Sequence, residues 1–327
     1  MLKFLCVLVG IIAFTNGSNS DLPAVTQITE PVDLAEGPIW DGRKNILFYV
    51  DILTGRVFSY NYNTREVNHV TLNGEVTPVI LTLDENLLLV GLNRDLVALE
   101  WDGTNELVQT KVISTVSQQF PGSRFNDGKA DKKGRLWIGT VGPWVNGVLS
   151  PDEGVFYKVT KENLENPSVE IAPVNNSNGL AWNAANDQLF YIDTNSNQVA
   201  GYDFDLEKCS ISNHRVVFDL KYHPELAGSP DGMAIDENDN LWVALYGGGC
   251  VIQVNPTSGE LLQTIAIPAR DVSSVMWGGP NLDILFVTTS RISLSEEEKL
   301  KSPAAGSVFA VTNLKTKGIP VFNADII

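Results

Sequence analysis

The chain has 327 residues, of which 43% are hydrophobic, and it carries a formal net charge of −16 with an isoelectric point near 4.5. This composition supports a large folded core, but a strongly acidic chain lacks the basic face that binding to a nucleic-acid backbone requires. We therefore expect no nucleic-acid partner. The acidic surface itself has two explanations, general solubility and the holding of cations.

The N-terminus has the pattern of a secretory signal peptide. Lys3 precedes an apolar run at residues 4–14, and small residues around Gly17 suit cleavage. The run is too short to span a bilayer, and no later stretch is long and apolar enough. We predict a signal peptide at residues 1–17 and a secreted mature chain without a membrane span. The alternative is that this segment stays in the protein as a buried first strand.

A pattern of one apolar residue, one acidic residue or Asn, a turn and an apolar strand recurs along the chain. Its acidic or Asn position falls at Asp41, Asp84, Asp131, Asn183, Asp236 and Asp283. Successive positions are 43 to 53 residues apart. Each unit continues with a further strand and an outer strand, so it holds about four strands, and helical periodicity is almost absent.

Six such units predict an all-β fold, namely a six-bladed β-propeller with four antiparallel strands per blade. One blade cannot bury both of its faces alone, so six blades must close into a ring. We expect residues 18–327 to form this single domain and the protein to be a monomer. A pair of β-sandwiches is the alternative, but it predicts no long-range period.

In such a ring, the loops that lead into the innermost strands meet at one mouth of the central channel, and function is expected there. Four polar residues, each followed by Gly, precede apolar inner strands. Alignment of the repeats places them at equivalent positions: Glu36, Asp127, Asn178 and Asp231.

Three of these residues suit a hard-cation site. Glu36, Asn178 and Asp231 offer two carboxylates and one amide oxygen without a neighbouring Cys or His. Oxygen ligands favour Ca²⁺, Mg²⁺ or Mn²⁺, and three protein ligands leave room for water and substrate. The alternative is that these side chains only cap turns.

Arg124 and Asn126 lie on the same approach to the channel. An arginine in an acidic mouth can bind hydroxyl groups or stabilise a developing oxyanion; its alternative role is a charge partner for Asp127. The histidines lie away from these positions, which argues against a Ser-His-Asp triad. Cys209 and Cys250, the cysteines beyond the signal peptide, form one disulfide or remain free thiols.

Five segments carry a resemblance to a known family: EGPIW, SRFNDGKAD, SNGLAW, SPDGMAID and GGPNLDILFVTT. In this order they resemble the regucalcin/senescence-marker-protein/gluconolactonase family, including its luciferin-regenerating-enzyme-like arthropod branch. The resemblance runs from about Val25 to Val321, which is nearly the whole mature chain.

The resemblance implies a six-bladed propeller with one divalent cation (Ca, Zn, Mn or Mg) held at the channel mouth by Glu36, Asn178 and Asp231. It further implies that Asp231 is the catalytic acid or base and that Arg124 and Asn126 bind the substrate. We therefore expect a secreted, metal-dependent hydrolase of small-molecule lactones or esters.

One departure from the family pattern concerns substrate specificity. The family has a substrate-contacting Glu after its Gly-Thr segment, but here Gly139-Thr140 is followed by residues 141–146 without a Glu, and Trp144 makes the pocket more apolar. Trp144 keeps open the hydrolysis of other esters, such as aryl lactones or organophosphates. The acidic charge and predicted export keep open a non-catalytic extracellular calcium-binding protein.

Overall fold

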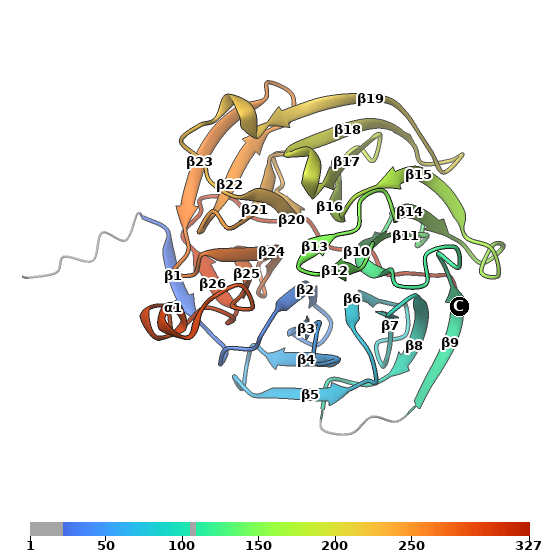
Figure 1. Cartoon of the computed structure of the whole chain (residues 1–327), viewed down its shortest axis with the longest axis horizontal. Helices are drawn as coiled ribbons and strands as arrows, with labels where there is room; N and C mark the ends of the chain where they lie inside the picture. Colours follow the sequence, from blue (N-terminus) through green and yellow to red (C-terminus); the bar gives the residue numbers. More distant parts are fainter. Residues whose placement is uncertain (1–21, 105–108) are drawn as a thin grey trace, which may run out of the picture.

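A computed structural model describes residues 22–104 and 109–327, so the predicted signal peptide lies outside the described residues. The strands form six four-stranded antiparallel sheets around a central axis (Figure 1). The prediction of an all-β, six-bladed propeller with four strands per blade is thus confirmed. In the described part of the chain, no helix has the length and apolar character needed to cross a membrane.

The first three blades follow one another along the chain, and in each the first strand lies innermost. Blade one contains β2 (Ala35–Asp41), β3 (Ile46–Asp51), β4 (Arg56–Asn61) and β5 (Val67–Thr71). Blade two contains β6 (Val76–Leu81), β7 (Leu87–Leu92), β8 (Asp95–Glu100) and β9 (Gln109–Thr115). Blade three contains β10 (Arg124–Ala130), β11 (Leu136–Val141), β14 (Gly154–Val159) and β15 (Ser168–Val174), with an inserted hairpin of β12 (Trp144–Val145) and β13 (Val148–Leu149).

The remaining blades continue the ring. Blade four contains β16 (Ser177–Trp182), β17 (Gln188–Asp193), β18 (Gln198–Asp205) and β19 (Ser210–Asp219). Blade five contains β20 (Ser229–Ile235), β21 (Leu241–Tyr246), β22 (Cys250–Asn255) and β23 (Glu260–Ala266). Blade six contains β24 (Asp271–Gly278), β25 (Ile284–Ser290), β26 (Phe309–Thr312) and β1 (Ala24–Gln27). Within residues 22–104 and 109–327, three short helices lie in the connections: η1 (Thr194–Ser196), η2 (Leu220–Tyr222) and α1 (Glu296–Lys301).

Both ends of the chain contribute to blade six, and this closes the ring. The N-terminal strand β1 pairs antiparallel with β26, from Ala24 opposite Thr312 to Gln27 opposite Phe309. Strands next to the innermost ones, such as β3 and β11, are buried at every residue because neighbouring blades cover both faces of the sheet. Outer strands such as β23 are mostly exposed instead.

The repeated aspartate of the sequence is a structural residue in several blades. Asp236 is fully buried, and its carboxylate accepts hydrogen bonds from the backbone N–H groups of Asn238 and Asn240, from the Trp242 indole and from the Gln253 amide. Asp131 binds its own turn and Trp137 in the same way. These carboxylates fix the hairpin turn between the first two strands of the blade.

The two cysteines in the described part of the chain are free thiols. Cys209 and Cys250 are both buried and unpaired. Burial raises the pKa of the Cys209 thiol to about 11, which makes it a weak nucleophile at neutral pH. Of the two possibilities left open by the sequence, the structure therefore has the free thiols.

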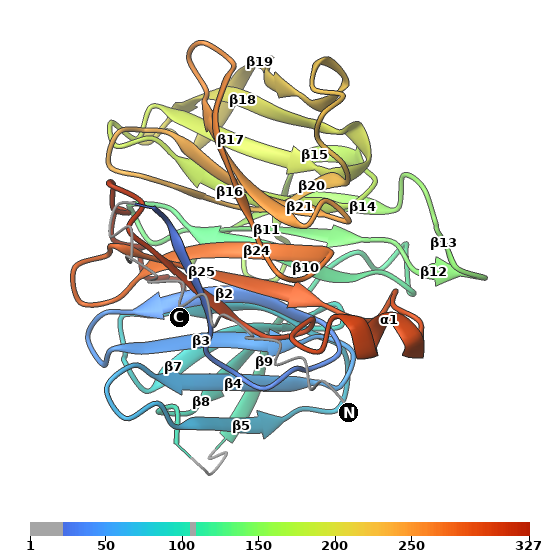
Figure 2. The same ribbon diagram turned by 90° about the vertical axis from the view of Figure 1, so that its left-hand side faces the viewer.

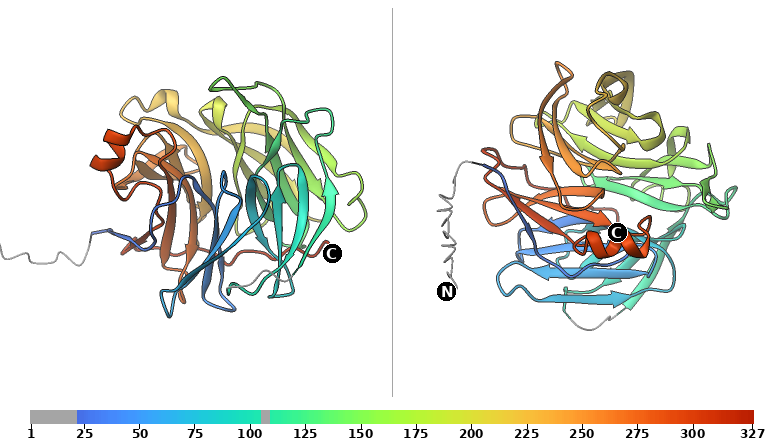
Figure 3. Two further views of the ribbon diagram at one scale, coloured as in Figure 1. Left: turned by 60° about the horizontal axis from the view of Figure 1, so that its bottom comes forward. Right: turned by 60° about the vertical axis from the view of Figure 1, so that its left-hand side comes forward.

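The C-terminal segment, residues 318–327, crosses one end of the channel; we call it the strap and that end the far end (Figure 3, left view). It begins at blades five and six, where Gly318 bridges to Asp236 and donates to the Leu282 carbonyl. It ends at blades two and three, where Ala324 exchanges backbone hydrogen bonds with residues 81 and 83 and Asp325 donates to Gly134. Loops at the opposite end, which we call the channel mouth, carry the β12–β13 hairpin and α1 (Figure 2).

The last two residues of the chain test whether the strap stabilises the propeller. Ile326 is 1% exposed and Ile327 is 46% exposed. We expect Ile326→Ala to lower the free energy of unfolding by about 2–4 kcal/mol, because it removes a buried side chain and leaves a cavity. The matched change Ile327→Ala should stay within about 0.5 kcal/mol of wild type. Chemical denaturation measures both changes. An effect of Ile326→Ala as small as that expected of Ile327→Ala would show that the strap does not support the ring.

Candidate functional site

Every innermost strand carries an irregularity close to the channel mouth. The pairing with the next strand shifts register after Glu36, Val76, Phe125, Ser177, Pro230 and Val272. Such β-bulges leave residues unpaired and redirect their side chains. The six irregularities therefore lie at one level of the channel, close to its mouth.

One polar residue from each blade occupies this level. In every blade, one residue of the innermost strand pairs with a leucine of the second strand. These leucines are Leu47, Leu88, Leu136, Leu189, Leu241 and Leu285. The polar residue lies four positions before the residue that pairs with the leucine. These six residues, which we call the polar ring, are Glu36, Thr77, Asn126, Asn178, Asp231 and Ser273.

The register corrects one sequence-based assignment. Alignment on the glycine that follows each polar residue placed Asp127 beside Glu36, Asn178 and Asp231, but the equivalent residue of blade three is Asn126. The cause is that Gly128 is already paired, opposite Ile138, whereas Gly179 and Gly232 lie unpaired within their bulges. Asp127 therefore lies one residue further along the strand.

Asn178 is held in a fixed orientation. Its Nδ2 donates to Thr194 Oγ1 at 2.6 Å, and the Thr194 hydroxyl donates to the Pro230 carbonyl at 2.8 Å. Its Oδ1 accepts from Asn126 Nδ2 at 2.9 Å. Because a carbonyl oxygen has two lone pairs, Oδ1 keeps one acceptor position for a ligand.

Asn126 connects Asn178 to Arg124. Arg124 Nη1 donates to Asn126 Oδ1 at 2.6 Å and to the Phe125 carbonyl at 2.8 Å, while Arg124 Nε pairs with Glu75 at 3.0 Å. Its Nη2 has no protein acceptor among the described residues. The structure thus brings the two residues predicted to bind substrate next to a predicted metal ligand, with one guanidinium nitrogen available.

The two carboxylates of the polar ring repel each other, with Asp231 buried and Glu36 partly buried. Burial, followed by the charge of Asp127, raises the pKa of Glu36 to about 8. Burial, followed by the charges of Glu36 and Asp127, raises the pKa of Asp231 well above its usual value, and Arg124 only partly opposes this. Three acids therefore share one enclosed space with a single nearby arginine.

Asp231 differs sharply from Asp236, five residues later on the same strand and turn. The carboxylate of Asp236 accepts five hydrogen bonds from the described chain. Asp231 is 8% exposed, and no hydrogen bond from the described chain lowers its pKa. A buried carboxylate without a donor is destabilising unless a cation or water satisfies it.

The donor set fits a hard divalent cation. Glu36, Asn178 and Asp231 supply oxygen atoms alone. Among the described residues no group of three or more His, Cys, Asp or Glu side chains could hold a metal ion, so a cation site here would depend on the amide oxygen of Asn178. Cation binding would replace the repulsion between Glu36 and Asp231 by attraction.

Several residues of this site were missed in the sequence. Thr77 and Ser273 complete the polar ring, and the repeat alignment would have found them had it been extended to blades two and six. Thr194 orients Asn178 from a different loop, and nothing in the local sequence signals that role. Tyr246 lies close enough to Asp231 for its pKa to respond to that charge, although burial is the main cause of its rise to about 12.

Comparison with known proteins identifies the family of the chain. Residues 34–291 match the family model described as SMP-30/Gluconolactonase/LRE-like region. The chain belongs to this family. Human regucalcin is 33% identical over 289 residues, which cover 88% of this chain and 93% of the human protein. Regucalcin from Gallus gallus is also 33% identical, over 290 residues that cover 88% and 94% of the two chains.

Solved structures agree with this membership. A luciferin-regenerating enzyme superposes with a TM-score of 0.86 at 32% identity and covers 93% of this chain and 99% of its own. A calcium-binding regucalcin from Agrobacterium tumefaciens has a TM-score of 0.82 at 20% identity, with 92% and 97% of the chains covered, and shows a shared fold.

The raised carboxyl pKa values predict how stability depends on pH in chelator-treated protein. A carboxyl group whose folded pKa lies above its unfolded value stabilises the protein while it is protonated, and this contribution is lost as pH rises towards the folded pKa. For Glu36 the window runs from about 4.5 to about 8. The unfolding temperature should therefore decrease as the pH is raised from 5.5 to 8.5. The decrease should be smaller in Glu36→Gln. An equal fall in both proteins would contradict these pKa shifts.

Proposed function

We propose that this protein is a secreted, divalent-metal-dependent hydrolase of lactones. The observation that carries the proposal is the enclosed pair Glu36 and Asp231, in which Asp231 has no donor from the described chain and Arg124 lies within electrostatic range of both. Family membership supports the reaction class, since gluconolactonase is part of the family's description. The predicted signal peptide supports export.

Glu36, Asn178 and Asp231 would hold the cation, with Asn178 presenting the free lone pair of its oriented Oδ1. A bound Ca²⁺, Zn²⁺, Mn²⁺ or Mg²⁺ would supply Lewis acidity toward the carbonyl of a lactone ring and would lower the pKa of a bound water. The remaining positions around three protein ligands are open to water and substrate.

The protein's own groups would bind the lactone and move the proton. Asp231 would accept a proton from the water that attacks the lactone carbonyl, and would return it to the ring oxygen as the bond between the acyl carbon and that oxygen breaks. The low exposure of Asp231 keeps bulk solvent from competing. Arg124 offers Nη2 to the oxygen on which negative charge develops, and Asn126 keeps the guanidinium in place. The Asn126 Oδ1 retains a lone pair for a substrate hydroxyl.

A second candidate is hydrolysis of more apolar esters, such as aryl lactones or organophosphates. The β12–β13 hairpin favours it, because Trp144, Val145 and Val148 are 64%, 54% and 68% exposed on the side of the channel mouth (Figure 2). Apolar side chains that no other element covers can pack against an apolar part of a substrate. A preference for aryl over sugar lactones would support this candidate.

The proposal is tested by screening wild-type protein on sugar lactones, aryl lactones and aryl phosphotriesters, each with Ca²⁺, Zn²⁺, Mn²⁺ or Mg²⁺ after chelation. We expect metal-dependent lactone hydrolysis, with kcat/KM reduced at least about a thousandfold in Asp231→Asn, because proton transfer and metal holding are lost together. The matched control is Asp152→Asn, an exposed acid beside the inserted hairpin, which should retain wild-type activity.

Two results would contradict the hydrolase proposal. One is tight cation binding without turnover of any substrate, which would favour a non-catalytic extracellular calcium-binding protein. The other is full activity of Asp231→Asn, which would place the proton transfer elsewhere.

A further inference from the structure

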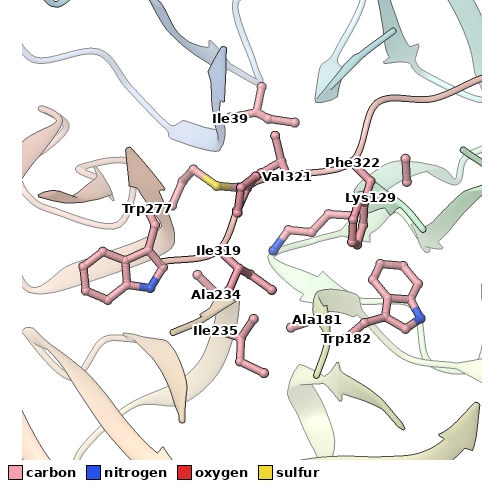
Figure 4. A pocket seen from close by; sticks show the side chains of 13 residues that line it. Ile39, Lys129, Ala181, Trp182, Ala234, Ile235, Trp277, Ile319, Val321 and Phe322 are labelled. Atoms are coloured by element: carbon pink, nitrogen blue, oxygen red, sulfur yellow. The ribbon is translucent and has the colours of Figure 1, made fainter. Parts of the chain in front are cut away.

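We propose that Lys129 is a positioning residue that holds Asn178 and Asp231 at the polar ring by clamping the ends of their two β-bulges. This inference rests on the proposed metal site and adds to it a residue that touches neither substrate nor cation. Lys129 belongs to β10, and its ammonium lies inside the channel (Figure 4).

The level of the channel below the polar ring makes room for this side chain. Three residues beyond each member of the ring lie Ile39, Ile80, Lys129, Ala181, Ala234 and Met276. Five of these are apolar and one is charged. The two smallest, Ala181 and Ala234, belong to blades four and five, and Lys129 of blade three extends towards them.

The ammonium joins three blades. Lys129 Nζ donates to the Leu180 carbonyl of β16 at 2.9 Å and to the Met233 carbonyl of β20 at 2.5 Å. Leu180 and Met233 are the first paired residues after the bulges, and each lies two residues beyond a ring member, Asn178 or Asp231. A charge-assisted bond to these carbonyls therefore fixes where each bulge ends.

In the described part of the chain, the surroundings of Lys129 leave little room for a bound ligand. The strap residues Ile319, Val321 and Phe322 line the same small cavity, whose volume of about 60 Å³ holds a few water molecules rather than a substrate (Figure 4). Burial lowers the pKa of Lys129, and the charge of Asp127 opposes this. An ammonium is costly to bury in such apolar surroundings, so its retention calls for a structural or functional role.

A clamp and a simple charge effect predict opposite results for removal of the ammonium. A positive charge near a divalent cation weakens cation binding by repulsion, so neutralising Lys129 would tighten binding if charge alone mattered. If Lys129 instead fixes Asn178 and Asp231, neutralising it releases both bulges and weakens binding. The sign of the change in Kd separates the two.

The experiment is calorimetric titration of chelator-treated, folded protein with Ca²⁺ and with Mn²⁺. We expect Lys129→Met to raise the Kd about tenfold or more, and Lys129→Arg to recover part of the loss because it keeps donors for both carbonyls. Lys158→Met is the matched control. Lys158 lies on β14, the third strand of blade three, and its Nζ also donates to a backbone carbonyl, that of Cys209. Its Kd should equal that of wild type.

The outcomes separate this inference from the proposed function. If wild type binds neither cation, the proposed metal site fails. If wild type binds and Lys129→Met binds equally or more tightly, the clamp is overturned while the metal site stands. If Lys129→Met does not fold, Lys129→Gln takes its place. We expect Lys129→Gln to fold and to bind the cation more weakly than wild type. Unchanged affinity of Lys129→Gln would overturn the clamp.

Discussion

The architecture of the channel mouth depends on one electrostatic constraint, the burial of like charges. Glu36 and Asp231 come from blades one and five, and Asp127 adds a third acid from blade three. Arg124 opposes the charges of Glu36 and Asp231 and is itself shared with Glu75, whereas Lys129 opposes the charge of Asp127. Folding brings these groups together at a cost in free energy, which is the reverse of what stability alone would select. A cation bound at this position would turn the cost into binding energy.

The propeller repeats one channel-facing position in every blade and places different residue types at it. Each innermost strand has an irregularity in its pairing near the channel mouth, so each blade offers one side chain to the channel without breaking the sheet. Blades two and six use that position for hydroxyls, Thr77 and Ser273, while blades one and five use it for acids. The far end of each hairpin is stabilised separately, by saturated carboxylates such as Asp236. Stability and the candidate site therefore occupy opposite ends of the same strands.

Much of this was predictable from the sequence, for a definite reason. The repeat of strand and turn signals reflects local chemistry, so it predicts six blades and places Glu36, Asn178, Asp231, Arg124 and Asn126 at one mouth. The sequence could not show that Asn126, rather than Asp127, occupies the polar ring in blade three. The reason is that a bulge shifts the register by one residue without any change in composition. Lys129 was missed because it acts across blade boundaries, on a residue 104 positions away. Thr194 was missed because it reaches Asn178 from a connecting segment 16 positions along the chain. Closure by β1 likewise depends on pairing between the two ends of the chain.

The most direct test of the account is to count cations and protons together. Chelator-treated protein would be titrated with CaCl₂ by calorimetry near pH 7, in buffers of different ionisation enthalpy. Because the carboxyl pKa values are raised in the cation-free protein, the account predicts one cation per chain and release of protons on binding. Binding with no proton release, or no binding of any divalent cation, would contradict it.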